Sequence, residues 1–584
     1  MRPSSPAPDR EANHDVLIAG RLLEQVTAGT GRPLSASVYE TARLVRLAPW
    51  VWGHHGRVDY LMALQGRDGA WGGPGGYALV PTLSATEALL HLALARDRPA
   101  IRADSATDAA DLLATAADRG LQALRSMLGE GARPRPPVQA RTVGSDILVP
   151  HLVKELNGTL RQGDPRSAAY RRLKHHTFAP FSWPSPPSLP SCRCSSPRGC
   201  GRPARHQDGA VGARAMADQA APPDHRSPLP NCRIFEATGA LADAAPDGMA
   251  SGMVDGASGE VPAGGGLVGG SPAATAAWLA GRPAAERDSN HTCSLEEVAR
   301  RYGGPVPGSW PATEFEQGHV VAALARAGLG SAVPRELRER LWRWVSRSTA
   351  VGCGPREACA ARSAAVHALG ELGARLPSRT VRLCATVTWA RCGPGEPVPS
   401  PVATAHTLEA VGAHAAAVPG QRLRWTSAII KITRWLCENQ HPGGHWEDPG
   451  HASPYYATSY VTMAMSRHGD RTGISAAARA GRWIRGTQRP DGSWGVWGGT
   501  AEETAYALQA LLALPHDRSS AAGSAAALTR GAAALRRLAA TETGRPPLWH
   551  GKDLYAPVAI IDAVILSVNR RLVARSWPAA PHLL

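Results

Sequence analysis

Apolar residues recur along most of the chain at the spacing of helices. In the segments 40–51 ("ETARLVRLAPWV") and 83–96 ("LSATEALLHLALAR"), Ala and Leu repeat at positions i, i+3, i+4 and i+7, which places them on one helical face. The same spacing returns at 315–328, 364–376 and 504–514. No sustained alternation of apolar and polar residues, the pattern of strands, interrupts the series. We therefore expect an all-α protein whose paired helices form a ring or a solenoid.

One stretch breaks this pattern. From about Phe178 to Cys232 the chain is dense in Pro, Ser, Arg and Cys and shows no periodicity. Such a composition buries too little apolar surface to offset the entropy of ordering the chain, so we expect an irregular insert over 178–262. Its four cysteines are Cys192, Cys194, Cys200 and Cys232. They could ligate zinc, although their spacing matches no common zinc module.

A tryptophan-containing phrase occurs three times. "QGRDGAWGG" at 65–73 returns as "QRPDGSWGV" at 488–496, and a copy without the acid, "QHPGGHW", occupies 440–446. In each copy a helix should end near the Gln, and the Gly should adopt the left-handed conformation of a tight turn. The Trp can then pack on a neighbouring helix end while the Gln amide bonds exposed backbone groups. We interpret the phrase as a structural tie between helices, not as a catalytic motif.

Composition and charge narrow the class of protein. The chain has 584 residues, of which 43% are hydrophobic, and a formal net charge of +16. Only four residues are lysines, and the arginines are scattered through Ala-rich stretches, so we expect a solvated basic surface and no nucleic-acid partner. No apolar run of about 18 residues predicts a membrane span, and the N-terminus lacks the apolar core of a signal peptide. Ten cysteines in so long a chain do not make a disulfide scaffold, which makes the cytoplasm the expected location.

The tryptophan repeats resemble the QW motif of the terpene cyclase and squalene–hopene cyclase superfamily. Further segments narrow the resemblance to bacterial class II diterpene cyclases. "SVYETARL" at 37–44 resembles their S-x-Y-[DE]-T-A signature, "SWPATEFEQGHVVAAL" at 309–324 their W/Y-P-x-x-x-F-E segment, and "LWHGKDLYAPV" at 548–558 their G-K-x-L-Y-x-P motif. "HASPYYAT" at 451–458 and "EETAYALQAL" at 502–511 also fit this branch.

The resemblance implies a βγ architecture of two α-helical barrels, with the γ barrel inserted after the first helix of the β barrel. It assigns 1–34 to the N-terminal segment and that first helix, 35–177 and 263–300 to the γ barrel, and 301–584 to the β barrel. The insert at 178–262 lies outside the resemblance.

The resemblance also implies a reaction. The family protonates the terminal alkene of geranylgeranyl diphosphate and closes it into a bicyclic, labdane-type (copalyl-like) diphosphate. The proton comes from a buried D-x-D-D motif, but the matching stretch places Ala358, Ala360 and Ala361 at the acids. Cys359, between them, would be weaker than Asp by about 4 pKa units, roughly 6 kcal/mol. Glu357 is the nearby carboxyl that could take over as the acid, unless it is an ordinary surface residue.

Other side chains are candidates for binding substrate. Lys552 belongs to the G-K-x-L-Y motif and could hold the diphosphate. Trp310, Tyr455, Tyr456 and Trp446 could line the cavity, where ring faces stabilise a carbocation, but core packing explains them equally well. His406 and His451 could act as a base or hold a water, or be core histidines. Mg²⁺ is the cofactor that the resemblance implies; no D-D-x-x-D motif is present for a class I metal cluster.

Two alternatives stay open at this point. The replaced acids suggest a catalytically inactive relic or an isoprenoid-binding helical-barrel protein. A squalene-type triterpene cyclase is the other possibility, although it predicts more QW copies and an apolar membrane-docking patch. The sequence does not indicate an oligomeric state.

Overall fold

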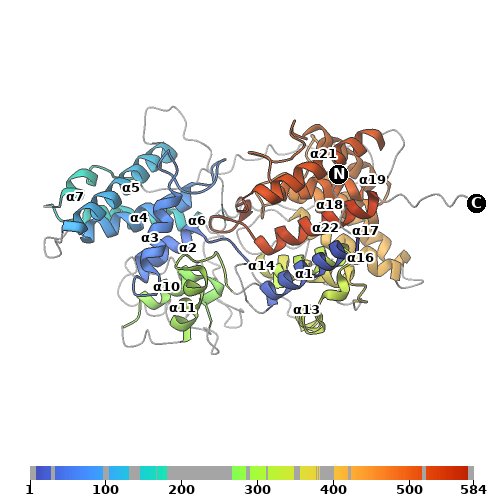
Figure 1. Ribbon diagram of the computed structural model, residues 1–584, viewed down its shortest axis with the longest axis horizontal. Helices are drawn as coiled ribbons and strands as arrows, with labels where there is room; N and C mark the ends of the chain where they lie inside the picture. Colours follow the sequence, from blue (N-terminus) through green and yellow to red (C-terminus); the bar gives the residue numbers. More distant parts are fainter. Residues whose placement is uncertain are drawn as a thin grey trace, which may run out of the picture.

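The computed structural model of the chain describes thirteen main segments. They are residues 8–27, 33–96, 104–129, 145–165, 167–179, 266–283, 290–310, 314–347, 356–376, 400–417, 422–515, 521–542 and 544–576. Most of these residues are helical, and the two strands among them have two residues each, which confirms the all-α expectation (Figure 1). Most of the Pro/Cys-rich insert, including Cys192, Cys194, Cys200 and Cys232, lies outside the described residues. None of the described helices is both long enough and apolar enough to cross a membrane.

Six helices of the C-terminal half form a closed ring, the second barrel. Each contacts the next, and the last contacts the first. They are α12 (Glu314–Arg326), α14 (Arg356–Glu371), α16 (Pro401–Ala417), α18 (Pro454–His468), α20 (Ala501–Ala513) and α22 (Val558–Ser576). Along α18 and α20 almost every residue is buried, because one face meets the centre of the ring and the other meets an outer layer.

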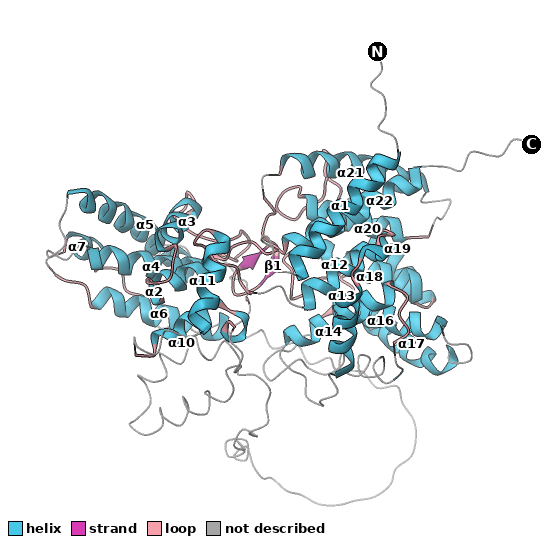
Figure 2. Cartoon of the chain, turned by 60° about the horizontal axis from the view of Figure 1, so that its bottom comes forward, coloured by secondary structure: helices cyan, strands magenta, loops and turns pink. Residues whose placement is uncertain are grey.

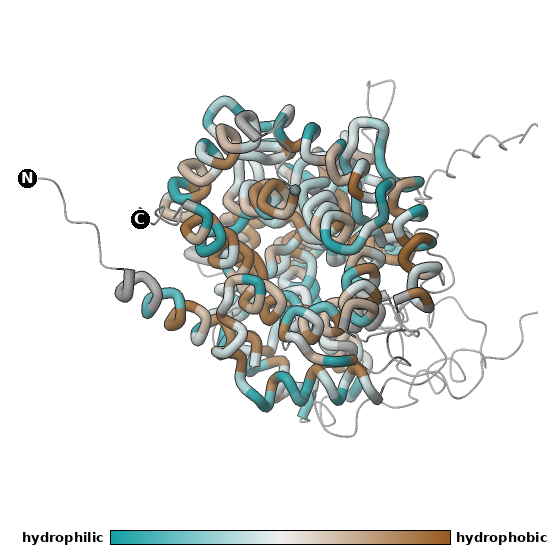
Figure 3. Tube along the Cα trace, turned by 90° about the vertical axis from the view of Figure 1, so that its right-hand side faces the viewer, coloured by the Kyte–Doolittle hydropathy of each residue, from teal (hydrophilic) through white to brown (hydrophobic). Residues whose placement is uncertain are grey.

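The outer layer of the second barrel returns the chain between inner helices. It consists of α1 (Pro8–Thr27), η4 (Gly330–Ala332), α13 (Arg335–Arg347), α17 (Arg422–Glu438), α19 (Arg471–Gly486) and α21 (Ala521–Thr541). The N-terminal α1 packs against α12 and α22, far along the sequence, as the dark blue helix in the right half of Figure 1 shows. Figure 3 views the molecule from the end that this barrel forms.

The segment between α1 and α12 builds a first barrel. Its inner helices α6, α4, α2 and α10 contact one another in that order, and α3, α5, α7 and α11 cover them. The bounds are α2 (Val38–Leu47), α3 (His54–Leu64), α4 (Leu79–Arg96), α5 (Asp104–Leu128), α6 (Ser145–Arg161), α7 (Ala168–Leu173), η2 (Val268–Gly270), α10 (Pro272–Ala280) and α11 (Asn290–Tyr302). Residues up to Trp310 still pack in a core cluster of this barrel, beyond the boundary at 300 that the sequence indicated.

The three tryptophan phrases fold into the same clasp. In each, the indole Nε1–H donates to the carbonyl ten residues earlier at 2.7 Å, and the Gln Nε2–H donates both to the turn and to a neighbouring helix. The indole pairs are Trp71–Leu61, Trp446–Leu436 and Trp494–Ile484. These bonds confirm the structural role expected of the phrase. The sequence did not indicate one partner, a Thr hydroxyl that accepts the Trp backbone N–H at Thr82, Thr458 and Thr504.

A short hairpin joins the two barrels. Its strands β1 (Trp549–His550) and β2 (Leu554–Tyr555) pair antiparallel and lie between the two bodies in Figure 2. The Ser35 N–H donates to the Ala556 carbonyl, and the Ala556 N–H donates to the Ser35 hydroxyl. The Ser37 hydroxyl donates to Asp553 at 2.9 Å. Gly73 of the first barrel lies so close to Leu554 that a Cβ there would approach it to 2.7 Å. These strands are too short to show an alternating pattern, so the sequence did not predict them.

Candidate active site

Aromatic side chains gather at one end of the second barrel. Where the connections are described, an outer helix carries the chain back from the end of one inner helix to the start of the next. The inner helices therefore run parallel, and their first turns lie at the same end of the barrel. Trp549 of the hairpin lies there, with ring centroids 4.7 Å from Tyr456, 5.1 Å from His451 and 6.0 Å from His319. Tyr506 is 5.4 Å from Tyr456. The first turns of α12, α18 and α20 therefore contribute to one aromatic cluster, the aromatic chamber.

A buried carboxyl, Glu502, stands at the edge of this chamber. It is 1% exposed, and its Oε1 accepts the indole N–H of Trp549 at 2.7 Å and lies 3.1 Å from His451 Nε2. Within the described part of the chain, its Oε2 has no hydrogen bond of ordinary geometry, although the Tyr506 hydroxyl lies beside the carboxyl. The first turn of α20 is fixed by its N-cap Thr500, whose hydroxyl accepts the Glu503 N–H, so the position of Glu502 is set by the helix start.

Two neutral histidines face the same chamber from neighbouring helices. His319 Nδ1 lies 3.0 Å from the Phe315 carbonyl, so Nδ1 carries the proton and Nε2 presents a lone pair. Burial lowers the pKa of His319 to about 3, and burial together with His367 and His319 lowers the pKa of His406 well below its usual value. Their ring centroids are 5.6 Å apart. Both rings are therefore uncharged at neutral pH.

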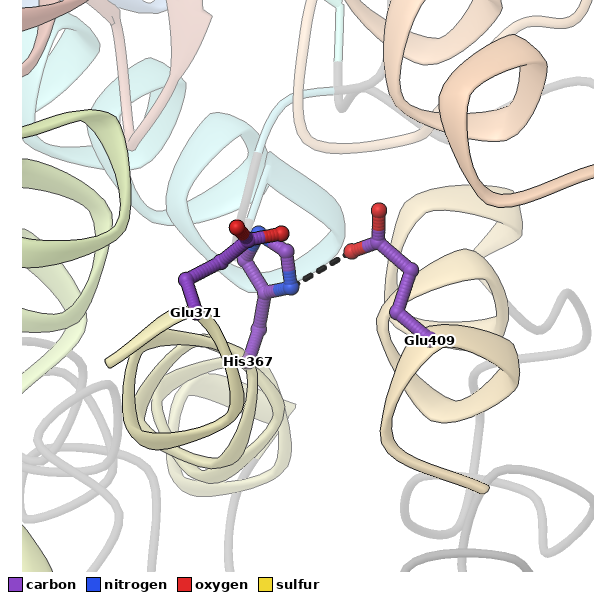
Figure 4. Close-up of side chains that lie close together, drawn as sticks. All are labelled: His367, Glu371 and Glu409. Carbon is purple, nitrogen blue, oxygen red and sulfur yellow. Dashed lines mark ion pairs between the residues drawn. The ribbon is translucent and has the colours of Figure 1, made fainter. Parts of the chain in front are cut away.

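Charged groups lie beside the histidines, between α12, α14 and α16. His367 Nδ1 lies 2.5 Å from a Glu409 oxygen, and Glu371 is close to both, as Figure 4 shows. Arg326 contacts all three of these side chains, and its guanidinium donates to His367 Nε2. Burial alone would raise the pKa of Glu409, but His367 and Arg326 lower it to about 2. The charges of this cluster thus compensate one another in an ion network.

This network is a poor place for the Mg²⁺ that the resemblance implied. His367, Glu371 and Glu409 are, among the described residues, the set whose ligand atoms lie close enough to share an ion. The guanidinium of Arg326 already contacts them, and an imidazole is a poor match for the oxygen ligands that Mg²⁺ prefers. The described residues therefore do not support a resident magnesium site.

Lys552 lies in the hairpin, at the junction of the barrels. Its Nζ is 2.7 Å from Glu40 Oε1 and 2.9 Å from the Ser271 hydroxyl, and it lies 5.2 Å from the centre of the Tyr39 ring. Asp553, the next residue, accepts the Tyr39 N–H at 3.0 Å, and its burial raises its pKa. The S-x-Y-[DE]-T-A and G-K-x-L-Y segments, at opposite ends of the chain, are therefore direct contact partners.

The chain is similar to known proteins over nearly its whole length. The chain is 36% identical to a labda-7,13-dienyl diphosphate synthase from Streptomyces clavuligerus, over 99% of this chain and 96% of that one. It is 35% identical to an ent-copalyl diphosphate synthase from Streptomyces sp. (strain KO-3988), over 91% of each. The solved structure of an ent-copalyl diphosphate synthase from Streptomyces platensis matches 96% of this chain and 99% of that chain, with a TM-score of 0.72 and 32% identity. No known family profile matches the sequence.

The chain belongs to the class II diterpene cyclases. In this cyclase the first turns of α14 carry Ala358, Ala360 and Ala361 where the family pattern has its acids. Glu357 lies in the same turns, but its side chain is outside the described residues. The proton donor is therefore the part of the family's machinery for which the sequence offers no matching residue.

The cyclase fold brings together some of the predicted site residues and separates others. Tyr456, His451 and His406 lie around the chamber. Tyr455 instead faces the outer helix α19, with its ring 4.8 Å from Trp483. Trp310 lies against Tyr302 in the first barrel. Trp446 is the indole of the middle clasp.

Several residues of the chamber were not predicted from the sequence: Glu502, Tyr506, Tyr460, His319 and Trp549. A signal for most of them exists. Polar or aromatic residues four positions apart follow the helix starts, as in Glu502–Tyr506 and Tyr456–Tyr460, and this spacing places both members on one face. Trp549 carries no such signal, because it reaches the chamber from a loop.

Proposed function

We propose that this cyclase converts geranylgeranyl diphosphate into a bicyclic, labdane-type diphosphate by protonating the terminal alkene. The observation that carries the proposal is the aromatic chamber closed by Trp549, in a chain whose full-length relatives bear the names of labdadienyl and copalyl diphosphate synthases. Ring faces stabilise a carbocation as they do other cations. A water-excluding wall protects such an intermediate from premature capture.

The remaining polar features fit the path of such a substrate. His319 and His406 are uncharged, so they do not repel a cation, and the Nε2 lone pair of His319 could accept a proton or hold a water. Tyr456 and Tyr506 stay protonated, because burial raises their pKa well above the usual value. We therefore place the isoprenoid tail against α12, α18 and α20.

For the diphosphate we propose the junction of the barrels. Lys552 is the cation there, and a diphosphate would share its ammonium with Glu40. Lys552→Met should raise the KM for the substrate more than it lowers kcat, whereas Lys552→Arg should restore part of the affinity. An unchanged KM in Lys552→Met would remove this residue from the proposal.

The direct test is incubation of the purified protein with geranylgeranyl diphosphate. The expected product is a bicyclic diphosphate, identified by mass spectrometry after removal of the phosphates. Parallel reactions with Mg²⁺ and with a chelator decide whether the metal is needed. The absence of product, together with the absence of binding by calorimetry, would refute the proposal.

Two other functions are less well supported. Replacement of the acids at 358–361 would suit an inactive relic, which would bind the substrate without converting it. The relatives named for diterpene diphosphates do not favour a squalene-type cyclase. We also place the enzyme in the cytoplasm, since Cys293 and Cys437, the described cysteines, are free thiols; cell fractionation would test this.

A further inference from the structure

The cyclase needs a carboxylic acid at the chamber, and the family's position for it holds alanines. The described part of the second barrel contains several buried carboxyls that could be considered. Glu409 is committed to His367 and Arg326. Both oxygens of Glu503 are bonded, one to the Val496 N–H at 2.8 Å and the other to Thr500 at 2.9 Å. Asp448 accepts backbone N–H groups from Val402 and Gly450. Glu502 differs from all of these.

Glu502 has one anchored oxygen and one unbound oxygen. Oε1 accepts from Trp549 and faces His451 Nε2, while Oε2 lacks a hydrogen bond of ordinary geometry among the described residues, and the Tyr506 hydroxyl lies beside the same carboxyl. The nearest contact of His451 Nδ1 is with the Ser453 N–H, at 3.0 Å against 3.2 Å to the Ser453 carbonyl. That contact makes Nδ1 an acceptor and leaves the ring proton on Nε2, pointing at Glu502.

This bonding pattern identifies Oε2 as the oxygen that would carry the proton of an acid. A carboxylate bonded only to neutral donors on one oxygen, and almost fully buried among aromatic rings, would carry an uncompensated charge. Oε1 already receives two N–H groups, so a proton belongs on Oε2. The same two N–H groups would donate to the carboxylate that remains after proton transfer.

We propose that Glu502 donates the initiating proton in this cyclase, in place of the acids missing from 358–361. The inference rests on the proposed function and names the residue that performs its first step. In the ring of six inner helices, α20 lies opposite α14. The terminal alkene therefore approaches the wall formed by α18 and α20, across the chamber from the family's usual position.

The chemistry balances without a co-reactant. The Oε2–H bond breaks and a C–H bond forms at the less substituted carbon of the terminal alkene. The tertiary carbon becomes a cation, and the electron pair of the O–H bond stays on the Glu502 carboxylate. Ring closure moves the cation along the chain until a C–H bond breaks and releases a proton. Glu502 regains a proton from solvent, with His451 as the adjacent carrier, and the overall reaction is an isomerisation.

Four proteins test the assignment with geranylgeranyl diphosphate: the parent chain, Glu502→Gln, Glu503→Gln and the triple variant Ala358→Asp, Ala360→Asp, Ala361→Asp. Glu502→Gln keeps the shape and an acceptor for Trp549 but removes the acidic proton. We expect it to lose turnover by about 10³-fold or more while calorimetry shows unchanged binding. Glu503→Gln is the matched control, because it removes an adjacent buried carboxyl that only stabilises the helix start. It should lower Tm and leave turnover of the folded enzyme unchanged.

Each outcome decides something different. Turnover by the parent chain that is lost only in Glu502→Gln supports the assignment. Equal turnover in Glu502→Gln and the parent overturns it and leaves the proposed function intact. Binding without turnover in the parent, with product only from the triple variant, also overturns it and identifies a relic. Absence of binding and product in all four proteins refutes the proposed function together with the assignment.

Discussion

The two barrels are built from the same helix pairs and clasps, yet their centres differ. In the first barrel, buried charges are paired across the inner helices: Arg43 Nη1 lies 2.6 Å from Glu155, and Arg46 lies 3.0 Å from Glu87. The surrounding core is mostly Leu, Ala and Val. In the second barrel, the corresponding space at the helix starts holds aromatic rings, neutral histidines and a carboxyl with an unbound oxygen.

This difference favours the second barrel as the place of the carbocation in the proposed reaction. The guanidinium groups of the first barrel are compensated by carboxylates, so the difference lies in its aliphatic side chains, which cannot stabilise a cation through ring faces. The second barrel also contains a buried guanidinium, Arg326, but Glu371 and Glu409 compensate it. A shared scaffold thus supports an aliphatic centre with paired charges in one half and a cluster of aromatic rings and neutral histidines in the other.

The largest expected loss of stability comes from substitutions in the tryptophan clasps, which both barrels contain. Trp71→Ala in the first barrel and Trp494→Ala in the second each remove a buried indole that is at most 1% exposed, together with its hydrogen bond. We expect each to lower the free energy of unfolding by about 3–5 kcal/mol. Hydrogen exchange should show faster opening only in the barrel that carries the substitution. Equal opening of both barrels would mean that they unfold as one unit.

A matched substitution controls for tryptophan itself. Trp497 is 39% exposed and contacts Tyr77 at the junction. Trp497→Ala should destabilise the protein far less than either clasp variant. A comparable loss would show that the indole surface, and not the clasp geometry, accounts for the effect.

Acid should destabilise the two barrels to different extents, by a smaller free energy than the tryptophan substitutions. The folded pKa of His319 is about 3, below its unfolded value near 6.5, so its contribution is complete above pH 6.5 and is lost as pH falls towards 3. At pH 5 this loss is about 2 kcal/mol. In the first barrel, burial raises the pKa of Glu155, but Arg43 outweighs burial and holds that pKa below the usual value. The contribution of Glu155 to stability therefore persists until the pH falls below about 4.5. Between pH 6.5 and 5 the second barrel should weaken more than the first, in which burial also lowers the pKa of His176, but to a smaller extent than that of His319.

Urea unfolding at several pH values, read by hydrogen exchange in α12 and α4, measures this separation. His319→Phe removes the titrating group and keeps an aromatic ring beside Phe315, so it should flatten the pH dependence of α12. Equal weakening of α4 over the same range would contradict the assignment of acid sensitivity to the second barrel.

Local motifs were predictable from the sequence, and long-range partners were not. The clasps followed from Gln, Gly and Trp within one phrase, because their bonds are set by a single turn. Lys552 was singled out, but its partner Glu40 lies 512 residues away, and no local pattern connects them. Tyr455 and Tyr456 are neighbours on a helix, and only the orientation of α18 decides which of them faces the chamber.

The smallest effect should come from the one place where the clasps differ. In two copies an Asp accepts the N–H two residues on, at 3.1 Å for both Asp68 and Asp491, whereas the middle copy has Gly443. A Cβ at Gly443 would meet only ordinary contacts, at 3.4 Å from His441 and His445. Gly443→Asp should therefore add the missing turn bond and reduce the freedom of the unfolded chain, for a gain of about 1 kcal/mol.

Two neighbouring substitutions frame this expectation, each measured as the midpoint of urea unfolding. Asp491→Gly should lose about 1 kcal/mol, because it removes the bond that Gly443→Asp would add. Gly444→Ala should lose more than that, since Gly444 has a φ of 103° and an added Cβ would lie 2.9 Å from the Arg479 carbonyl oxygen. If Gly443→Asp lowered the midpoint instead, the middle clasp would differ from the other two in more than its acid. The hydrogen bonds of that clasp, from Gln440 to Ala476 and from Trp446 to Leu436, would then be compatible only with glycine at position 443.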